Sequence, residues 1–340
     1  MPERVLIVSS YPPRRCGIGA YAATQAARLR GAGADVIVLS PPDGAGDVRV
    51  DFLANGRVFR EAARRSEPAD RIVVHFQPAL YYRPGARAAA QKVAISWALL
   101  RLVSRRPHTE ILVHEADPPI RWRPDYVLLR RVFARARLRF HTDAERIALQ
   151  RAYGLRRVRA ALVDHVDGIT VHGPAGREEA RRRLGLRQDD PVFVCAGFVH
   201  PDKGYDRAIR AFAAAGSPGR LDLVGSVRDA TPENVAAATE LRDLGERTPG
   251  VTLHKGFADN LDFDAWIAAA DAVILPYRRS WSSGALARAQ ALGTPALVSD
   301  AGGLPEQAGP NDRVFRTDDE LAELLREVVA THPATAEAAP

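Results

Sequence analysis

The sequence predicts an α/β protein with two doubly wound parallel-sheet domains. Short apolar runs alternate with segments of helical periodicity, the alternation occurs in both halves of the chain, and loops of small or charged residues follow several of the runs. A strand of a parallel sheet is covered by helices on both faces, so it reads as a continuous apolar run. The length of 340 residues suits two domains of roughly 150 to 190 residues each.

The first half opens with a βαβ unit. The apolar run 5–8 is followed by a loop with two glycines, a helical segment and the run 36–39. The strands expected in this half are residues 4–9, 36–39, 72–75, 111–114 and 138–141, and the expected helices are residues 18–31, 86–105, 126–140 and 143–153.

Residues 160–176 separate the two halves, because they contain three glycines and a proline and few periodic positions. We therefore expect one domain over residues 1–165 and another over residues 166–330. The segment 331–340 is rich in alanine and proline, and we expect a disordered tail there.

The second half repeats the alternation of strands and helices. Its expected strands are residues 192–196, 221–224, 251–254, 272–275 and 295–298, and its expected helices are residues 178–184, 204–215, 232–246, 262–270, 283–292 and 318–329. Right-handed crossovers bring the carboxyl ends of such parallel strands to one edge of a sheet, where ligands bind in this class of fold.

Composition narrows the class of protein. The longest apolar run near the middle, 93–100, is far shorter than the ~20 residues of a membrane span. The N-terminal residues lack the basic start and cleavage site of a signal peptide, so we expect a cytoplasmic protein. Cys16 and Cys195 fall in different domains, and we expect two idle thiols and no metal cluster.

The net charge of +7 reflects a bias toward arginine, since only three of the 48 basic residues are lysines. No aromatic stacking platform or nucleic-acid-binding motif accompanies the charge, so we expect no nucleic-acid partner. Residues 121–139 combine an apolar face with several arginines. A helix with this pattern can rest on an anionic membrane or bind a phosphorylated acceptor. The alternative is an ordinary surface helix in an arginine-biased chain.

The loop from Gly197 to Gly204 directly follows an expected strand and directly precedes an expected helix. It contains His200 and Lys203. Glycine lets the backbone approach a ligand, the helix N-terminus favours an anion, and the lysine adds a full positive charge. The loop therefore indicates a diphosphate site, with a solvated surface lysine as the alternative.

Two more loops of small residues follow neighbouring strands. The turn Ser282-Ser283-Gly284 opens the helix 283–292, and its amide groups are expected to face a phosphate. Capping of the helix by a serine is the alternative. The loop containing Gly302 and Gly303 follows the next strand. Three such loops at one sheet edge favour an anion site over three separate caps.

The first half carries weaker signals of the same kind. Gly17 and Gly19 lie in the loop between the first strand and the first helix. His114 ends a buried strand at its carboxyl edge, and His75 ends the preceding one. A polar residue at a strand end is often purely structural. A functional role for these positions is therefore expected only if the second half also carries a ligand site.

The segment 192–307 resembles the donor-binding domain of the retaining GT-B glycosyltransferases of family four, the group 1-like enzymes. The matching features are the loop 197–204, the strand and loop 272–284, the segment 289–295 and the loop 302–306. The resemblance implies a GT-B fold of two Rossmann-like domains that face a central cleft. It covers roughly the whole chain and is specific mainly in the second half.

The resemblance implies transfer of a sugar from a nucleotide-diphosphate sugar to an acceptor hydroxyl, with retention of configuration. It makes residues 166–330 the sugar-nucleotide-binding domain and residues 1–165 the acceptor-binding domain, with no metal and no cofactor beyond the donor. The acceptor is unknown: a small molecule, a glycan or a lipid-linked molecule. The implied catalytic residues are His114, Lys203 and Gly19, and the implied binding residues are Gly17, Gly197, His200, Lys203, Ser282, Ser283, Gly284, Arg288, Gly302 and Gly303.

The chain departs from the family pattern at three positions. Ser280 and Arg288 occupy the places of two glutamates that in the family lie near the donor sugar and the ribose, and Phe198 replaces a phosphate-binding arginine. We expect His200, Arg278 or Arg279 to compensate for that arginine. The departures leave open a GT-B protein that transfers nothing: a sugar-nucleotide epimerase or hydrolase, or a catalytically weak binding partner.

Overall fold

A computed structural model describes residues 2–332, apart from residues 68–69, 86–87, 116–120, 122, 175, 228–230, 255 and 257. The chain divides into two compact units, Met1–Ile169 and Thr170–Pro340. Most of the expected tail, residues 333–340, lies outside the described residues. The first two residues of that tail belong to the folded part, because Thr331 caps the last helix and the His332 side chain is buried.

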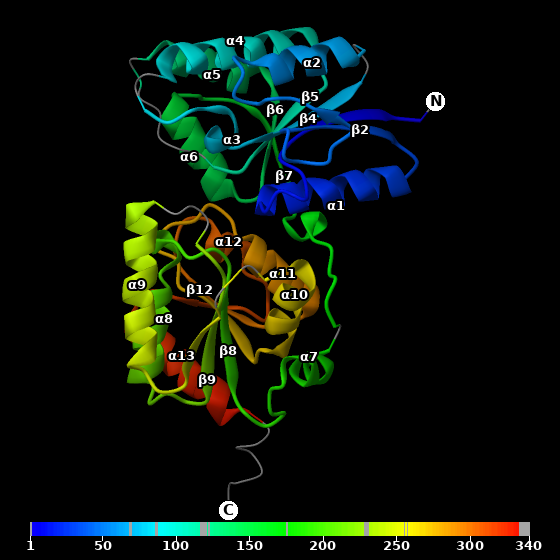
Figure 1. Ribbon diagram of the computed structural model, residues 1–340. Coiled ribbons are helices and arrows are strands. Elements are labelled where there is room, and N and C mark those ends of the chain that lie inside the picture. The colour runs from blue at the N-terminus through cyan, green and yellow to red at the C-terminus, as the bar shows by residue number, and fades with distance from the viewer. Residues whose placement is uncertain are drawn as a thin grey trace, which may run out of the picture. The chain divides into compact units, whose positions relative to one another are not determined.

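The first unit is built on a parallel sheet of seven strands in the order β3-β2-β1-β4-β5-β6-β7 (Figure 1). The strands are β1 (Arg4–Val8), β2 (Asp35–Ser40), β3 (Val48–Arg49), β4 (Arg71–Phe76), β5 (Thr109–Val113), β6 (Arg137–Phe140) and β7 (Arg159–Leu162). Every neighbouring pair is parallel. The apolar run of β1 is fully buried from Val5 to Val8, as expected for a central strand covered on both faces.

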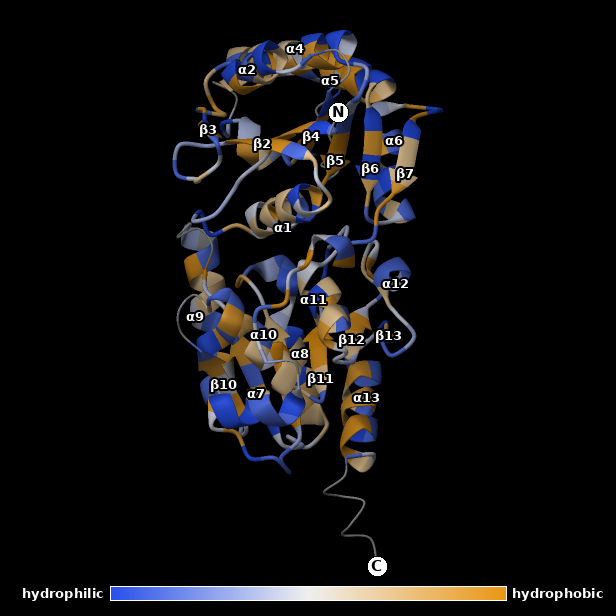
Figure 2. Ribbon diagram, turned by 90° about the vertical axis from the view of Figure 1, so that its right-hand side faces the viewer, coloured by the Kyte–Doolittle hydropathy of each residue, from blue (hydrophilic) through white to orange (hydrophobic). Residues whose placement is uncertain are grey.

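Helices cover both faces of this sheet. They are α1 (Gly17–Gly31), α2 (Arg57–Arg65), α3 (Pro78–Tyr81), α4 (Ala89–Arg105), α5 (Pro124–Arg135) and α6 (Asp143–Tyr153), with a 3₁₀ turn η2 at Val166–Gly168. Figures 1 and 2 show α2, α4 and α5 as one layer over one face, with α1 on the opposite face. The sheet between these layers is largely apolar, as the orange strands β4 and β5 in Figure 2 show.

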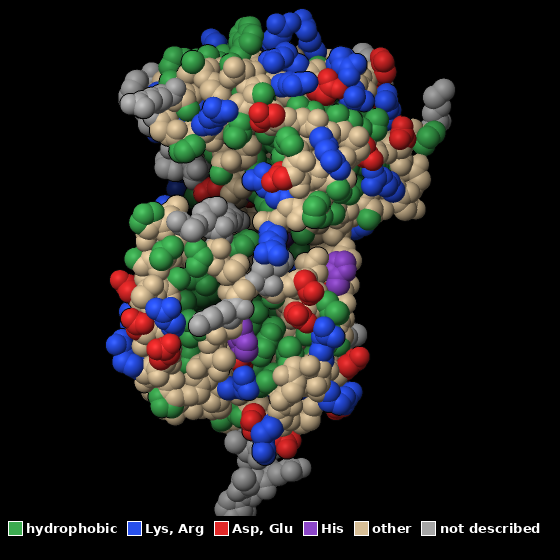
Figure 3. Space-filling view, viewed as in Figure 1, with side chains coloured by type: hydrophobic (Ala, Val, Ile, Leu, Met, Phe, Trp, Pro, Cys, Tyr) green, Lys and Arg blue, Asp and Glu red, His purple; other side chains and the backbone are tan. Residues whose placement is uncertain are grey.

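The outer surface of the α4–α5 layer combines apolar and basic side chains. The Trp97 side chain of α4 is 52% exposed and that of Val127 of α5 is 44% exposed. They line a shallow hollow together with Val93, Pro124, Leu128 and Arg131. Figure 3 shows basic side chains gathered over this end of the unit. Among the described residues, none of the helices has both the length and the apolar character that crossing a membrane requires.

The second unit holds a six-stranded parallel sheet in the order β10-β9-β8-β11-β12-β13. Its strands are β8 (Val192–Ala196), β9 (Arg220–Val224), β10 (Val251–His254), β11 (Ala272–Leu275), β12 (Ala296–Ser299) and β13 (Arg313–Phe315). Its helices are α7 (Arg177–Leu184), α8 (Tyr205–Ala214), α9 (Pro232–Glu246), α10 (Asn260–Ala269), α11 (Gly284–Leu292), α12 (Leu304–Gln307) and α13 (Asp318–Ala330), with a 3₁₀ turn η3 at Pro201–Lys203.

Two apolar clusters fill the two faces of the second sheet. One joins α7, α10 and α11 to the sheet, and the other joins α8 and α13 to it. The strands β8, β11 and β12 contribute alternate residues to the two clusters, since successive side chains of a strand point to opposite faces. The expected doubly wound arrangement is therefore confirmed in both units.

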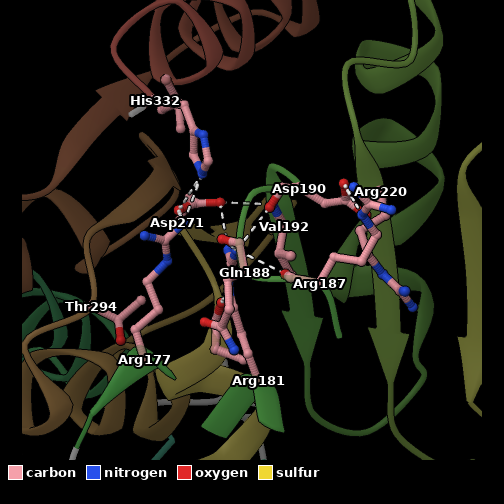
Figure 4. Close-up of polar contacts among 12 residues, drawn as sticks. Arg177, Arg181, Arg187, Gln188, Asp190, Val192, Arg220, Asp271, Thr294 and His332 are labelled. Atoms are coloured by element: carbon pink, nitrogen blue, oxygen red, sulfur yellow. Dashed lines mark hydrogen bonds and ion pairs between the residues drawn. The ribbon is translucent and has the colours of Figure 1, made fainter. Parts of the chain in front are cut away.

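A buried arginine fastens the entry of the second unit to its sheet (Figure 4). Arg181 of α7 has no exposed surface, and its guanidinium donates to the carbonyl oxygen of Ala269 at 2.9 Å and to Asp271 Oδ2 at 2.9 Å. It also donates to three backbone carbonyls of the segment that leads into β8, those of Arg187, Gln188 and Asp190. One side chain thus ties α7, the start of β8 and the α10–β11 connection together.

Candidate functional site

Three loops meet at the carboxyl edge of the second sheet. They follow the neighbouring strands β8, β11 and β12 and span residues 197–204, 276–284 and 300–303. The Arg278 N–H donates to the Asp202 carbonyl oxygen at 2.8 Å, and the Gly303 N–H donates to the Ser280 carbonyl oxygen at 3.2 Å. Backbone hydrogen bonds therefore join the middle loop to both of its neighbours, and the three loops form one surface.

Two glycines allow this close packing of the loops. Gly204 has a φ of +62°, and a Cβ atom there would lie 2.1 Å from the Pro276 carbonyl oxygen. Gly302 has a φ of +59°, and its Cβ atom would lie 1.8 Å from the Ser280 carbonyl oxygen. Both separations are far below van der Waals contact, so neither position accepts another residue without moving the loop beside it.

Lys203 is the cation of this surface. Its ammonium nitrogen lies 3.7 Å from the centroid of the buried Tyr277 ring, in a cation–π contact. Over the part of the chain that the structure describes, Lys203 forms no ion pair with a carboxylate. The Tyr277 hydroxyl lies 3.3 Å from Ser283 Oγ, at the start of α11. The ring thus supports the ammonium group and leaves its charge available to an anion.

The start of α11 offers amide groups, although not all those that the sequence suggested. The Ser283 hydroxyl accepts the Leu286 N–H at 3.2 Å, and the Ser283 N–H donates to Gln307 Oε1 at 2.7 Å. Ser283 is therefore the cap of the helix, and both its polar groups are occupied. The N–H groups of Gly284 and Ala285 have no acceptor among the described residues, and Gly284 is exposed. These two amides can still bind a phosphate oxygen.

Other glycines of the predicted set serve the loops. The Gly197 N–H donates to the Val224 carbonyl oxygen at 3.0 Å, and that of Gly303 is used by Ser280. Gly302 is exposed, and Ser282 is half-buried with its carbonyl oxygen accepting from the Ser280 hydroxyl at 2.8 Å. Some of the binding residues predicted in this unit thus face outward: Lys203, Ser282, Gly284 and Gly302. Others stabilise the loops: Gly197, Ser283 and Gly303.

Arg288 was predicted to bind the donor, but the structure gives it a different role. Its side chain is 10% exposed, and its guanidinium donates to Asp264 Oδ1 at 2.5 Å. The other oxygen of the fully buried Asp264 accepts the N–H groups of His172 at 2.6 Å and Gly173 at 3.0 Å. The face of α11 that carries Arg288 is turned toward α10, so the arginine neutralises a carboxylate that anchors the chain before α7.

The three residues expected to replace the missing arginine differ in availability. The Arg278 guanidinium donates to both carboxylate oxygens of Asp206 at 2.7 Å, so its charge is already compensated. The Arg279 side chain is 72% exposed and lies 3.7 Å from Asp202. His200 is exposed, and its Nδ1 accepts the Asp202 N–H at 3.2 Å. His200 and Arg279 therefore stay accessible, whereas Arg278 stabilises the loop.

In the first unit, α1 begins against the end of β1. A Cβ atom at Gly19 would lie 3.2 Å from both Ser10 Oγ and the Tyr11 backbone nitrogen, which is tighter than ordinary contact. A Cβ atom at Gly17 would meet nothing within 4 Å. The close approach of α1 to the loop that follows β1 therefore favours glycine at position 19, and packing places no such demand on position 17.

Four histidines surround Tyr21 at the carboxyl edge of the first sheet. The ring centroids of His75, His114, His141 and His165 lie 5.6, 5.9, 5.4 and 5.7 Å from that of Tyr21, all edge-on. His141 and His165 stack on each other at 4.0 Å. The sequence analysis identified His114 and His75 and missed the other two. A signal was present, because His114 and His141 directly follow β5 and β6.

Burial keeps these imidazoles uncharged. It lowers the pKa of His75 to about 3 and that of His141 to about 4, and it lowers the pKa of His114 and His165 well below the usual value of 6.5. Burial also raises the pKa of the Tyr21 hydroxyl to about 12. The cluster is therefore neutral near pH 7, and its ring nitrogens can donate to or accept from hydroxyl groups.

Within the described residues, no group of three or more His, Cys, Asp or Glu side chains is arranged to hold a metal ion. Both cysteines are free thiols; Cys16 is half-buried at the start of α1, and Cys195 is buried in β8, where burial raises the pKa of its thiol.

Solved structures with the same architecture identify the fold class of this chain. The chain superposes on sucrose-phosphate synthase from Thermosynechococcus elongatus with a TM-score of 0.70 and 15% identity, covering 98% of this chain and 91% of that one. Anabaena HepE, solved in complex with UDP-glucose, gives a TM-score of 0.68 and 17% identity, with 98% and 94% covered. The two parallel sheets with their flanking helices are those of the GT-B fold.

Residues 190–331 match the model of the family "Glycosyl transferases group 1". The second unit is therefore similar, over these residues, to the group 1 glycosyltransferases. This family match covers all three loops of the candidate site.

Curated relatives extend the similarity. D-inositol 3-phosphate glycosyltransferase 2 of Catenulispora acidiphila is 32% identical over 181 residues, which is 51% of this chain and 42% of that protein. The 2-deoxystreptamine glucosyltransferase of Streptomyces kanamyceticus is 27% identical over 275 residues, which is 78% of this chain and 68% of that protein. The match to the first of these relatives thus spans less than half of its length.

Proposed function

We propose that this chain transfers a sugar from a nucleotide-diphosphate sugar to an acceptor hydroxyl, with retention of configuration at the anomeric carbon. The observation that carries the proposal is the Lys203 ammonium on the Tyr277 ring, whose hydroxyl contacts Ser283 at the start of α11. Within the described part of the chain, Lys203 has no carboxylate partner and the amides of Gly284 and Ala285 have no acceptor. A pyrophosphate is the anion that suits one cation and two amides along a loop edge. The family match over residues 190–331 supports the same substrate class.

Such a pyrophosphate-binding site favours the reaction by stabilising the leaving group. As the bond from the anomeric carbon to the diphosphate stretches, negative charge accumulates on the departing oxygen. Fixed amides and an ammonium group bind this developing charge more strongly than the ground state, and that difference lowers the barrier. The loss of one such donor costs on the order of 10²–10³ in rate in enzymes of this general type. We assign this role to Lys203 and the start of α11, and we propose that no metal ion is needed.

The first unit supplies the groups for the acceptor in this proposal. The acceptor oxygen forms its bond to the anomeric carbon on the face that the diphosphate leaves, and the hydroxyl proton passes to the departing phosphate oxygen. In this proposal His114 and the first turn of α1, which contains Gly17 and Gly19, contact the sugar and the acceptor. Neutral imidazoles suit this role, because they exchange hydrogen bonds with hydroxyl groups without trapping a charge.

A donor-binding experiment tests the proposal. Melting temperatures are measured with UDP-, GDP-, ADP- and dTDP-sugars, since a ligand at 100 times its Kd adds about 2.7 kcal/mol of stability. We expect one donor to raise the melting temperature, Lys203→Ala to lose most of that rise, and the exposed control Arg242→Ala on α9 to keep it. An equal rise in Lys203→Ala and the parent would remove Lys203 from the site, and no rise with any donor would contradict the proposal.

A second candidate function is a GT-B protein that binds sugar nucleotides without transferring the sugar. It is favoured by Ser280 and Arg288 at the positions of the family's glutamates, and by the engagement of Arg288 with Asp264. Product analysis separates the two candidates. A glycosylated acceptor supports transfer, free sugar indicates a hydrolase, a new sugar epimer indicates an epimerase, and binding without turnover indicates a binding partner. Turnover that persists with a chelator present supports metal independence.

The outer surface of α4 and α5 suits an anionic membrane. Trp97 and Val127 present apolar surface, and Arg131 lines the same hollow. Aromatic and apolar groups insert at the headgroup level while arginines pair with anionic lipids, so the two kinds of residue act together. We therefore place the chain at the inner face of a membrane, held peripherally through the segment 121–139 and α4.

A further inference from the structure

A chain of three polar side chains crosses the first unit from α1 to the end of β5. Gln25 Oε1 lies 3.0 Å from His75 Nε2, and His75 Nδ1 lies 3.0 Å from His114 Nε2. His75 has no exposed surface, and His114 is half-buried. The rings of the two histidines are nearly parallel, with centroids 5.2 Å apart. These hydrogen bonds therefore link a residue on the surface of α1, through the buried His75, to the partly accessible imidazole of His114.

The backbone on both sides of this chain is fixed. The Tyr81 hydroxyl donates to the His75 carbonyl oxygen at 2.8 Å, and the His114 N–H donates to the Phe76 carbonyl oxygen at 3.0 Å. Tyr21 lies edge-on to both rings. These hydrogen bonds fix the strand ends that carry the two imidazoles, and the Tyr21 ring packs against both of them.

The direction of the two side-chain hydrogen bonds follows from the chemistry of the groups. An amide oxygen only accepts, so the proton between Gln25 and His75 belongs to His75 Nε2. A neutral imidazole carries one ring proton, and burial keeps His75 neutral. His75 Nδ1 must then accept, and the proton in the second bond belongs to His114 Nε2. By the same rule His114 Nδ1 holds a lone pair, and it has no partner among the described residues.

We propose that Gln25 and His75 are positioning residues that hold His114 in the tautomer with its proton on Nε2 and an acceptor at Nδ1. In this tautomer His114 accepts a hydrogen bond from a hydroxyl group of a bound sugar or acceptor. That consequence rests on the proposed function, whereas the tautomer itself does not. Specifying the tautomer of a catalytic imidazole through a buried partner is a general device of enzymes.

Nitrogen-15 NMR of histidine-labelled protein tests the tautomer without any substrate. The long-range spectrum distinguishes a protonated from an unprotonated ring nitrogen, and His114→Gln identifies the signals of His114 by their loss. We expect a protonated Nε2 and an unprotonated Nδ1 for His114 at pH 7. A protonated Nδ1, or an equal mixture of tautomers, would overturn the proposal, since it would mean that Gln25 presents its NH₂ group or that no direction is imposed.

Matched variants test the roles of the two positioning residues. His75→Asn keeps an acceptor at the place of Nδ1, whereas His75→Gln keeps a polar group only at the place of Nε2. We expect His114 to keep its Nε2 proton in His75→Asn and to become a mixture in His75→Gln. At Gln25, which is half-buried, Gln25→Glu preserves the acceptor and Gln25→Leu removes it, so this pair applies if the core variants fold poorly. Identical tautomers within both pairs would overturn the positioning roles.

Turnover gives a separate readout. With the donor identified by the melting screen, we expect His75→Gln to lower kcat about tenfold, the effect of one lost hydrogen bond, with KM for the donor little changed. His75→Asn should recover most of the loss. If no transfer is found at all but the NMR spectra are as expected, the proposed function fails and the inference about the tautomer stands. If KM and kcat change alike in both variants, the role of His75 is only structural.

Discussion

Lys203 and Arg288 show how one kind of charge serves binding at one position and folding at another. The Lys203 ammonium rests on an aromatic ring at an accessible loop edge, without a carboxylate partner among the described residues. Arg288 is buried against Asp264, which has no exposed surface. Breaking a buried pair by removal of one partner costs about 3–5 kcal/mol, so Arg288 is committed to the fold. Only the first kind of cation is available to a ligand.

The buried histidines predict a loss of stability in mild acid. The folded-state pKa of His75 is about 3, below its unfolded value, so the unfolded chain binds more protons below pH 6.5. Stability from this residue is therefore complete above pH 6.5 and falls with decreasing pH at about 1.4 kcal/mol per pH unit until pH 3 is approached. Relative to His75→Asn, the parent should lose about 2 kcal/mol between pH 7 and pH 5.

Urea unfolding of the parent and of His75→Asn at the two pH values measures this difference. The comparison cancels the contributions of other groups, including Glu145, whose pKa burial raises to about 8. A stability difference that stays constant from pH 7 to pH 5 would show that His75 is charged in the folded protein.

Single residues also show where sequence reasoning reaches its limit. It placed Lys203 and Gly284 on one ligand-facing edge, because the carboxyl ends of neighbouring parallel strands must meet there. It left a serine cap of the helix open as the alternative, and Ser283 is that cap. It did not predict that Gln307 accepts the Ser283 N–H, or that Arg288 faces Asp264. Such assignments depend on which way a side chain turns, and on partners far along the chain, neither of which periodicity records.

At the scale of elements, one buried side chain of α7 makes most of the hydrogen bonds, among the described residues, between this helix and the rest of its unit. Arg181 donates to Asp271, to Ala269 and to the carbonyls that lead into β8. Replacement by methionine keeps much of the volume, removes the guanidinium donor from the four backbone carbonyls, and leaves Asp271 with Arg177 and the Val192 N–H. We expect Arg181→Met to lower the free energy of unfolding by about 3–5 kcal/mol. Arg182→Met, on the same helix but 66% exposed, should change it by less than about 0.5 kcal/mol.

Chemical denaturation of the two variants checks this prediction. Equal midpoints for Arg181→Met and Arg182→Met would mean that α7 is held by its apolar contacts and that the arginine network adds little.

The α4–α5 surface predicts binding to anionic membranes. Burial of an aromatic side chain of this size is worth about 1.5–3 kcal/mol, so Trp97→Ala should weaken binding to phosphatidylserine-containing vesicles about tenfold. Binding should also weaken at high salt, because the arginines contribute through screened charges. Vesicle co-sedimentation measures both effects.

Val235→Ala, an exposed apolar position on α9 in the other unit, is the control for the membrane experiment. Equal binding by the parent and Trp97→Ala, or equal binding to neutral and anionic vesicles, would exclude this surface as the membrane contact.

The strands that the sequence did not predict, unlike the unpredicted helices α2, α3 and α12, share a physical character. The strand β3 has two residues, β13 has three, and β7 is an edge strand whose Leu162 is 54% exposed. Short or half-exposed strands lack the continuous apolar run that identifies a buried one. The stretch 160–176, predicted to separate the two halves, thus begins with the last three residues of β7 and also includes η2. The long central strands, by contrast, were all placed within two residues of their ends.

For the whole molecule, the strand orders of both sheets explain why the candidate residues lie at loop edges. In each sheet the first strand of the unit lies inside the sheet, and the chain winds outward to both sides, which is the doubly wound pattern that the alternation predicted. The units divide between Ile169 and Thr170, whereas the sequence suggested a boundary after residue 165. The turn η2, which contacts α1, explains why the first unit extends past that point.

Hydrogen exchange of the intact chain, with and without the sugar nucleotide that raises its melting temperature most, tests the central claim most directly. The claim is that the carboxyl edge of the second sheet binds the pyrophosphate of the donor. We expect saturating ligand to slow the exchange of the amides at Gly284 and Ala285, which have no acceptor in the described part of the chain, together with those of the loop around Lys203. Unchanged exchange at the start of α11 under saturating ligand would contradict the claim.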